Sequence, residues 1–214
     1  FESRNGFTKS VFGNMMRFSL NDGIIPILTT KKVAWKTCLK ELLWFVNGDT
    51  SNKTLKKQNV KIWNGNSTRE FLDSRGLTSY EEDELGPIYG YQWRNWNAPY
   101  LGKNINHKGN GIDQLSSIIE NLKDPQERFS RRLILSAWNV EQLNQMALPP
   151  CHVLSQFHVL DKDKLYCTLY QRSGDVGLGV PFNIASYAFL THMIAKNCGL
   201  RAMELTHYIG NAHI

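Results

Sequence analysis

The chain has 214 residues, of which 42% are hydrophobic and 21% charged, a composition typical of a globular domain of ordinary size. No apolar run approaches the roughly 20 residues that a membrane-spanning helix needs. The formal net charge of +6 favours anionic partners, and a phosphorylated small molecule explains it as well as nucleic acid does. Four cysteines lie far apart without a C-x-x-C spacing, which argues against a disulfide scaffold and against a zinc site.

The first part of the chain predicts a strand, a turn and a helix. Residues 11–20 show the weak alternation of a strand, and Asn21-Asp-Gly23 is a turn signal. Thr29-Thr30 predicts the cap of a helix over residues 32–46, which Asn47-Gly48 would end. Shorter helices are predicted further on, over residues 51–57, 67–72 and 112–122.

The second part predicts strands followed by one long helix. Residues 133–138 form a short apolar run typical of a buried strand, and residues 156–170 alternate around a polar turn like a hairpin. Pro181 predicts the start of a helix that Gly199 ends, with Met193 among the residues on its buried side. The aromatic and glycine-rich segment 85–94 suits either core packing or a stacking surface.

Glu41 is a candidate for proton transfer. Its helical neighbours include Cys38, Trp44 and Phe45, so the carboxylate is expected to be partly buried. Burial disfavours the charged form and would raise the pKa of the carboxyl toward neutrality. The alternative is a glutamate at the edge of an amphipathic helix face, which needs no chemical role.

Cys151 is the candidate nucleophile. It follows the pair Pro149-Pro150, which favours extended backbone and places the thiol at the head of a strand. His152 would point to the opposite face, so a cation such as Arg172 is the better activator. The alternative is an inert thiol, as we expect for three cysteines in apolar contexts, Cys38, Cys167 and Cys198.

Several motifs together resemble one family. They are Glu41-Leu-Leu-Trp-Phe45, Gly86-Pro-Ile-Tyr-Gly-Tyr-Gln-Trp93, Ser130-Arg-Arg132, Ser136-Ala-Trp-Asn-Val140, Leu148-Pro-Pro-Cys-His152, Leu169-Tyr-Gln-Arg-Ser173 with Asp175, and Leu178-Gly-Val-Pro-Phe-Asn-Ile-Ala185. In this order they resemble the thymidylate synthases over nearly all 214 residues. The resemblance implies an α+β fold with a large twisted mixed β-sheet, flanking helices, and sheets packed face to face in an obligate homodimer. It also implies a cytoplasmic protein.

The implied reaction is reductive methylation of dUMP to dTMP for dTTP biosynthesis. The co-substrate is 5,10-methylenetetrahydrofolate, which leaves as dihydrofolate, and no metal takes part. The resemblance implies catalytic roles for Cys151, Glu41, Tyr89, Arg172 and Asp175. It implies dUMP contacts from Arg4, Arg131, Arg132, Arg172, Ser173, Gly174, Asp175, Asn183 and His213, and folate contacts from Ile62, Trp63, Asp175 and Gly179.

Within that family, each residue would have a distinct task. Cys151 would add to C6 of the uracil, and Asn183 would read the amide edge of the base. Arg131 and Arg132 would reach the phosphate bound by the partner subunit, so each active site would be shared. His213 would bind the deoxyribose hydroxyl. Tyr89 would assist removal of the C5 proton, while Glu41 would move protons near the C4 carbonyl.

The chain departs from the family pattern in three places. The spacing from Arg4 to Phe12 is one residue shorter than usual, and Asn211 stands where the family has aspartate. The final residues lie just before an expected tyrosine and a closing segment. We therefore expect residues 1–214 to be a single catalytic domain without the extreme N-terminus and the C-terminal closing segment, which would bind nucleotide but lack full turnover.

Three other functions remain open at this stage. A pyrimidine-nucleotide hydroxymethylase would use the same thiol and folate but finish with water instead of hydride. A nucleotide- or RNA-binding homologue would lack catalysis, although the set of Cys151, Arg172 and Asn183 argues against it. A cysteine hydrolase would need a histidine base, which the adjacent position of His152 disfavours. Fusion to dihydrofolate reductase is also compatible with the sequence.

Overall fold

The computed structural model describes residues 2–3 and 6–214 and has an α+β architecture. The chain forms two compact units. The first unit comprises residues 1–38, 119–134 and 151–214, and the second comprises residues 39–118 and 135–150. Within the described ranges, no helix is long and apolar enough to cross a membrane.

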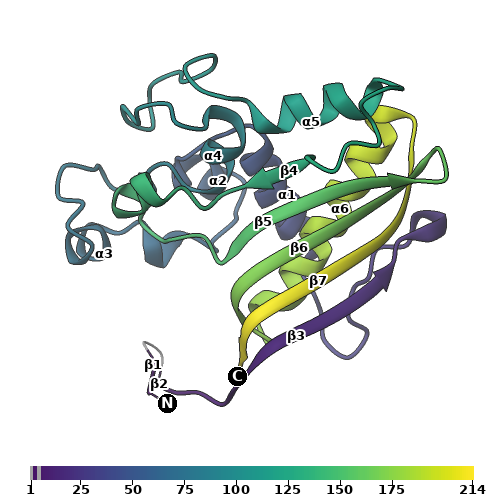
Figure 1. Ribbon diagram of the computed structural model, residues 1–214. Coiled ribbons are helices and arrows are strands. Elements are labelled where there is room, and N and C mark those ends of the chain that lie inside the picture. Colours follow the sequence, from purple (N-terminus) through teal and green to yellow (C-terminus); the bar gives the residue numbers. More distant parts are fainter. Residues whose placement is uncertain (1, 4–5) are drawn as a thin grey trace. The chain divides into compact units, whose positions relative to one another are not determined.

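The chain forms a mixed β-sheet with four of its five strands in the first unit, while the fifth crosses the division between the units after residue 134 (Figure 1). Its strands follow the order β3 (Ser10–Ser19), β7 (Arg201–His213), β6 (Lys164–Asp175), β5 (His152–Leu160) and β4 (Ile134–Ser136). The β6–β7 pair is parallel, whereas β3–β7 and β5–β6 are antiparallel. A two-stranded hairpin of β1 (Glu2–Ser3) and β2 (Gly6–Phe7) precedes the sheet. The predicted α+β class with a mixed sheet is therefore confirmed, and so is the predicted hairpin of β5 and β6.

One long helix, α6 (Gly179–Cys198), covers one face of this sheet (Figure 1). The covered face follows from alternation, because every second residue of β6 from Leu165 to Gln171 is buried. Gly199 ends the helix in the left-handed conformation at φ 66°, as its position predicts. The helix begins two residues before Pro181. The prediction that Met193 lies on the buried side is wrong, because its side chain is 36% exposed.

The second unit consists of short helices around an aromatic core. Its helices are the end of α1 (Trp35–Val46), α2 (Asn52–Lys57), η2 (Asn64–Asn66), α3 (Arg69–Ser74), α4 (Tyr89–Asn95), the start of α5 (Gln114–Lys123) and η3 (Val140–Gln145). The Phe45 ring lies 4.9 Å from Tyr89 and 5.7 Å from Trp93. Tyr89, Tyr91 and Trp93 are all buried. The aromatic segment around α4 is therefore core, and the stacking-surface alternative is wrong.

Several element boundaries differ from the sequence prediction, and for two of them the structure shows the cause. Helix α1 begins at Trp35 rather than Lys32, because Val33 is buried against Cys38 and Ala185 ahead of the first helical turn. A strand over residues 133–138 is shortened to Ile134–Ser136. It ends there because the Ser136 amide donates to Gln114 Oε1 and the Trp138 amide to Ser136 Oγ, which replaces the ladder with side-chain bonds.

Gly90 shows how tightly the second unit is packed. A Cβ atom at this position would lie 2.2 Å from the Phe45 carbonyl oxygen and 2.6 Å from Phe45 Cα. We expect Gly90→Ala to lower the free energy of unfolding by about 3 kcal/mol, because backbone atoms must move to admit a methyl group. Gly65→Ala is the matched control, since nothing lies within 4 Å of its Cβ, and it should change stability by less than about 0.5 kcal/mol. Urea unfolding of both variants measures the difference, and equal stabilities would contradict the packing argument.

Candidate active site

Cys151 lies directly before β5, at the turn that leads into the sheet. Its carbonyl oxygen accepts a hydrogen bond from the Arg172 amide at 2.8 Å, which fixes this turn against β6. The side chain is half-buried, so the sulfur is held by backbone structure yet remains accessible. The position at the head of a strand is the one predicted from the two preceding prolines.

Arg172 brings a cation to the sulfur. Its Nη2 atom lies 3.7 Å from Cys151 Sγ, from the neighbouring strand. A guanidinium cannot lose its proton in a protein, so Arg172 places a permanent positive charge beside the sulfur. The predicted pairing of Arg172 with the candidate nucleophile is thus present in the structure.

His152 has a structural environment rather than a catalytic one. Its Nδ1 atom lies 2.8 Å from Tyr187 Oη under α6, and the side chain is only 7% exposed. Burial lowers the pKa of this imidazole to about 3 and so keeps it neutral. This arrangement agrees with the expectation that His152 points away from Cys151 and does not act as its base.

The ends of β6 and β7 bring further predicted residues together. Ser173 and Asp175 end β6, and the parallel register places Asp175 opposite His213. Asp175 Oδ1 accepts from the amides of Gly177 and Leu178 at 2.9 and 2.8 Å, so it also holds the loop that leads into α6. Gly174 packs closely, because a Cβ there would lie 2.7 Å from Val180.

His213 is oriented by a neighbour on its own strand. Its Nδ1 atom lies 3.0 Å from Asn211 Oδ1, which is the residue where the chain departs from the family pattern. This contact holds the imidazole ring in place at the end of β7.

Of the other arginines predicted to bind phosphate, the structure describes Arg131 and Arg132 but not Arg4. Arg131 and Arg132 lie just before β4 and are both exposed. The Arg131 carbonyl accepts from Gln156 Nε2 at 3.0 Å, which fixes its backbone but leaves the guanidinium at the surface. Arg4 lies outside the described residues.

The second unit holds the candidate for proton transfer. Glu41 Oε1 accepts a hydrogen bond from Trp63 Nε1 at 2.7 Å. Burial raises the pKa of the Glu41 carboxyl to about 7, against the smaller lowering effect of that hydrogen bond. The carboxyl is therefore poised between its two protonation states near neutral pH, as the neighbours of Glu41 predicted.

Three other predicted site residues, Trp63, Tyr89 and Ile62, belong to the same unit as Glu41. The Trp63 ring lies 6.0 Å from the Tyr89 ring, and both are buried. Ile62 is 41% exposed and presents an apolar side chain to solvent. Glu41, Trp63 and Tyr89 thus form one cluster, with Ile62 at its exposed margin.

The residues described by the structure include no group of three or more His, Cys, Asp or Glu side chains arranged to hold a metal ion. The four cysteines all lie in the described ranges and form no disulfide with one another. Cys38, Cys167 and Cys198 are buried, as predicted. Burial raises the pKa of Cys167 to about 12 and makes it unreactive.

Reactivity of the thiol tests the role of the guanidinium. We expect Arg172→Gln to slow alkylation of Cys151 by iodoacetamide about tenfold at pH 7, because the variant lacks the cation that stabilises the attacking thiolate. Arg201→Gln is the control, since Arg201 pairs with Asp163 on an exposed surface. Mass spectrometry of the Cys151 peptide gives the rate, and equal rates in the two variants would contradict the assignment.

Comparison with known proteins identifies the family of the chain. The family model described as thymidylate synthase matches residues 2–214. The chain belongs to the thymidylate synthase family. It is 55% identical over 207 residues to the thymidylate synthase of Ascaris suum, covering 97% of the chain and 69% of that protein. It is 52% identical to the human thymidylate synthase, again over 97% of the chain but 65% of that protein.

A second kind of relative is a fused enzyme. The chain is 54% identical over 216 residues to the bifunctional dihydrofolate reductase-thymidylate synthase of Leishmania major, covering all of the chain and 41% of that protein. The chain therefore spans between about two fifths and just over two thirds of the length of these relatives. The family predicted from the sequence motifs is confirmed.

Two polar residues close to this site, Gln171 and His207, were not predicted from the sequence. Gln171 donates to Asn183 Oδ1 at 3.0 Å, and His207 Nε2 lies 2.9 Å from Gln171 Oε1. The alternation of buried and exposed residues along β6 could have indicated Gln171. Gln171 follows Leu165, Cys167 and Leu169 on the buried face of β6, and a polar side chain in such a row must find a partner.

Proposed function

We propose that the protein is a thymidylate synthase that converts dUMP to dTMP with 5,10-methylenetetrahydrofolate. The observation that carries this proposal is the Arg172 guanidinium 3.7 Å from Cys151 Sγ at the head of β5. A stabilised thiolate is the nucleophile that attack on C6 of a uracil requires. Family membership over residues 2–214 supports the same reaction and supports one catalytic domain across both units.

The chain's residues divide the work of this reaction. The Cys151 sulfur forms a bond to C6, which moves an electron pair toward the C4 carbonyl and makes C5 nucleophilic. Asn183 orients the base at its amide edge. Glu41 moves protons near that carbonyl with a carboxyl whose pKa is about 7. Tyr89 assists removal of the C5 proton, and the C6–sulfur bond breaks at the end to restore the thiol.

Phosphate is held by a hydroxyl and by arginines in this proposal. Ser173 donates to the phosphate from the end of β6, and Arg172 contacts it as well as the sulfur. Arg forks match phosphate oxygens in geometry and charge, which suits the surplus of positive charge in the chain. Arg4, whose placement the structure does not describe, remains a predicted phosphate ligand.

The reduced folate supplies the one-carbon unit and the hydride. Its proposed ligands fit a flat heteroaromatic ring. Val176 and Leu178 are 45% and 67% exposed, and these apolar side chains flank Asp175 and Gly179. Asp175 keeps its second carboxylate oxygen for a pterin N–H, because only Oδ1 is used by the loop. Ile62 and Trp63 are the proposed folate contacts of the second unit.

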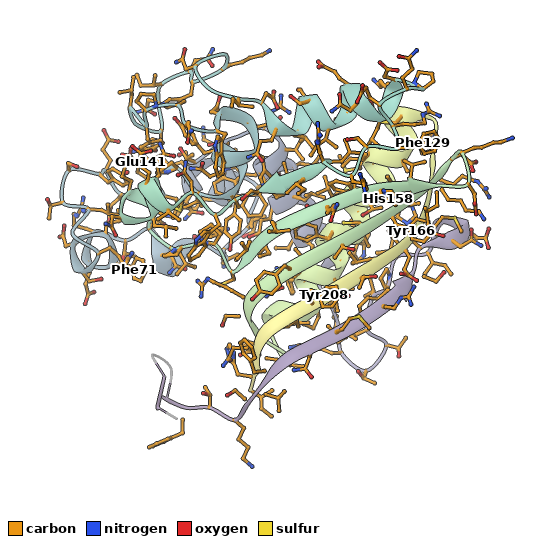
Figure 2. The ribbon with its side chains drawn as sticks, viewed as in Figure 1. Phe71, Phe129, Glu141, His158, Tyr166 and Tyr208 are labelled. Atoms are coloured by element: carbon orange, nitrogen blue, oxygen red, sulfur yellow. The ribbon has the colours of Figure 1, made fainter. Side chains whose placement is uncertain are left out.

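We also propose a homodimer built on the sheet face opposite α6. Tyr170 and Tyr208 are register partners on that face and are 40% and 42% exposed. Figure 2 shows Tyr208, Tyr166 and His158 projecting from it. Such a row of half-exposed aromatic side chains is typical of a subunit interface. Arg131 and Arg132 would then serve the partner's phosphate site. Sedimentation of the full-length protein tests the dimer, and a monomer at micromolar concentration would overturn it. A cytoplasmic location stays a prediction.

One assay separates this function from its nearest alternatives. The full-length protein is given dUMP tritiated at C5 together with methylenetetrahydrofolate, and tritium release and dihydrofolate absorbance are followed together. Both signals in step support thymidylate synthesis. Tritium release without dihydrofolate would indicate hydroxymethylation instead, and the absence of both would favour a homologue that only binds nucleotide.

A further inference from the structure

Two polar side chains lie on the buried face of the sheet, beneath α6. Gln171 on β6 is 2% exposed and His207 on β7 is 0% exposed. Both stand in rows of apolar residues, with Leu169 before Gln171 and Leu205 before His207. Buried polar groups at such positions are costly unless each hydrogen bond is made with the correct polarity.

The direction of the Gln171 amide is fixed by the backbone. One amide end lies 2.9 Å from the Ser173 carbonyl oxygen, which can only accept. That end must therefore be the NH₂ group, and the oxygen must face His207. Since this oxygen only accepts, the His207 Nε2 atom at 2.9 Å must carry the proton.

His207 is consistent with this single tautomer. Its Nδ1 atom is buried and has no hydrogen-bond partner among the described residues, as suits an unprotonated nitrogen rather than an N–H. Burial lowers the pKa of His207 to about 4, so the ring is neutral at pH 7 and holds one proton. That proton is on Nε2.

The same constraint passes on to Asn183. The second hydrogen of Gln171 Nε2 donates to Asn183 Oδ1 at 3.0 Å. If the Asn183 amide were turned by 180°, two NH₂ groups would face each other. The Asn183 NH₂ group therefore points away from Gln171, where it can donate to a ligand.

We propose that His207 is a positioning residue that acts through Gln171 to make Asn183 a donor to a carbonyl oxygen of the bound base. This inference rests on the proposed function, because the base is taken to be that of a pyrimidine nucleotide. Uracil presents a carbonyl oxygen at C4, whereas cytosine presents an amino group there. The relay from His207 to Asn183 thus contributes to the selection of dUMP over dCMP, although His207 itself touches no substrate.

Two variants of His207 separate this role from a structural one. His207→Leu keeps a similar volume but removes the donor, which leaves the Gln171 oxygen without its partner and the amide held only at its nitrogen end. His207→Gln keeps a donor at a similar reach. We measure the affinities of dUMP and dCMP for the full-length protein by calorimetry. The ratio of the two affinities is expected to fall about tenfold in His207→Leu and to stay within about threefold of wild type in His207→Gln. A general loss of stability would not change this ratio.

The outcomes distinguish the inference from the function on which it rests. An unchanged ratio in His207→Leu, with wild type still preferring dUMP, overturns the relay and leaves the proposed function intact. Wild type that does not bind dUMP overturns the proposed function. Nitrogen NMR of the wild-type histidines needs no variant to fold: a proton on Nε2 of His207 at pH 7 supports the relay, and a proton on Nδ1 overturns it.

Discussion

Cys151→Ala is expected to abolish turnover of dUMP, with a loss of at least about 10⁴-fold in kcat, while the affinity for dUMP stays within about fivefold of wild type. The sulfur forms the bond on which every later step depends, so no other group can replace it. The phosphate, base and sugar contacts proposed for Ser173, Asn183 and His213 do not involve the sulfur. Binding and catalysis should therefore separate in this variant.

Single-turnover assays and calorimetry with the full-length protein measure the two quantities. Cys198→Ala is the matched control, because Cys198 is a buried thiol whose Sγ donates to the Ile119 carbonyl at 3.8 Å in the same unit. It should lose some stability but keep kcat. Turnover by Cys151→Ala at more than about one hundredth of the wild-type rate would rule out covalent attack by Cys151.

The alternation of β5 and β6 and the C-terminal end of α6 at Gly199 were predictable because they depend on neighbours in the sequence. The same holds for the placement of Cys151 after two prolines. The start of α1 was not predictable, since it depends on Val33 packing against Ala185, which lies 152 positions later in the printed sequence. The early end of β4 likewise depends on the Gln114 side chain, which no local pattern reveals.

In the candidate site, too, the features set by sequence neighbours were predictable and those set by distant residues were not. Glu41 was predicted to have a raised pKa from its helical neighbours alone, although its Trp63 partner was not. The relay from His207 to Asn183 depends on a carbonyl at Ser173, on the register of β6 and β7, and on the placement of α6. Such a network is visible in the sequence only as a polar residue on a buried face, without its partner or its direction.

The nucleophile pair, Cys151 and Arg172, and the proton-transfer pair, Glu41 and Trp63, are held in place by different parts of the structure. Cys151 and Arg172 are joined by a backbone hydrogen bond between neighbouring strands, so their spacing is set by sheet geometry. Glu41 and Trp63 are joined by side chains in an aromatic core, so their spacing is set by packing. Substitutions that loosen the core of the second unit, such as Gly90→Ala, should therefore affect Glu41 before they affect Cys151.

Glu41→Gln is expected to lower kcat by about 10²- to 10⁴-fold, the usual range for the loss of a proton-transfer group. The wild-type pH profile of kcat should show a limb near pH 7, where the Glu41 carboxyl titrates, and the variant should lack that limb. Trp63→Phe removes the hydrogen bond that favours the ionised carboxyl, so its limb should move to higher pH. A limb that stays near pH 7 in Glu41→Gln would assign it to another group.

The same pKa makes a prediction about stability. The folded protein holds a proton on Glu41 up to about pH 7, whereas the unfolded chain releases it near its ordinary value of 4.5. Between these values the folded state binds more protons, so stability falls as pH rises. The loss is roughly 3 kcal/mol from pH 4.5 to 7, at about 1.4 kcal/mol for each unit. Urea unfolding should show this decline in wild type and a decline smaller by that amount in Glu41→Gln. Equal slopes in the two proteins would mean that the buried carboxyl is already ionised, and proton transfer by Glu41 would then require another explanation.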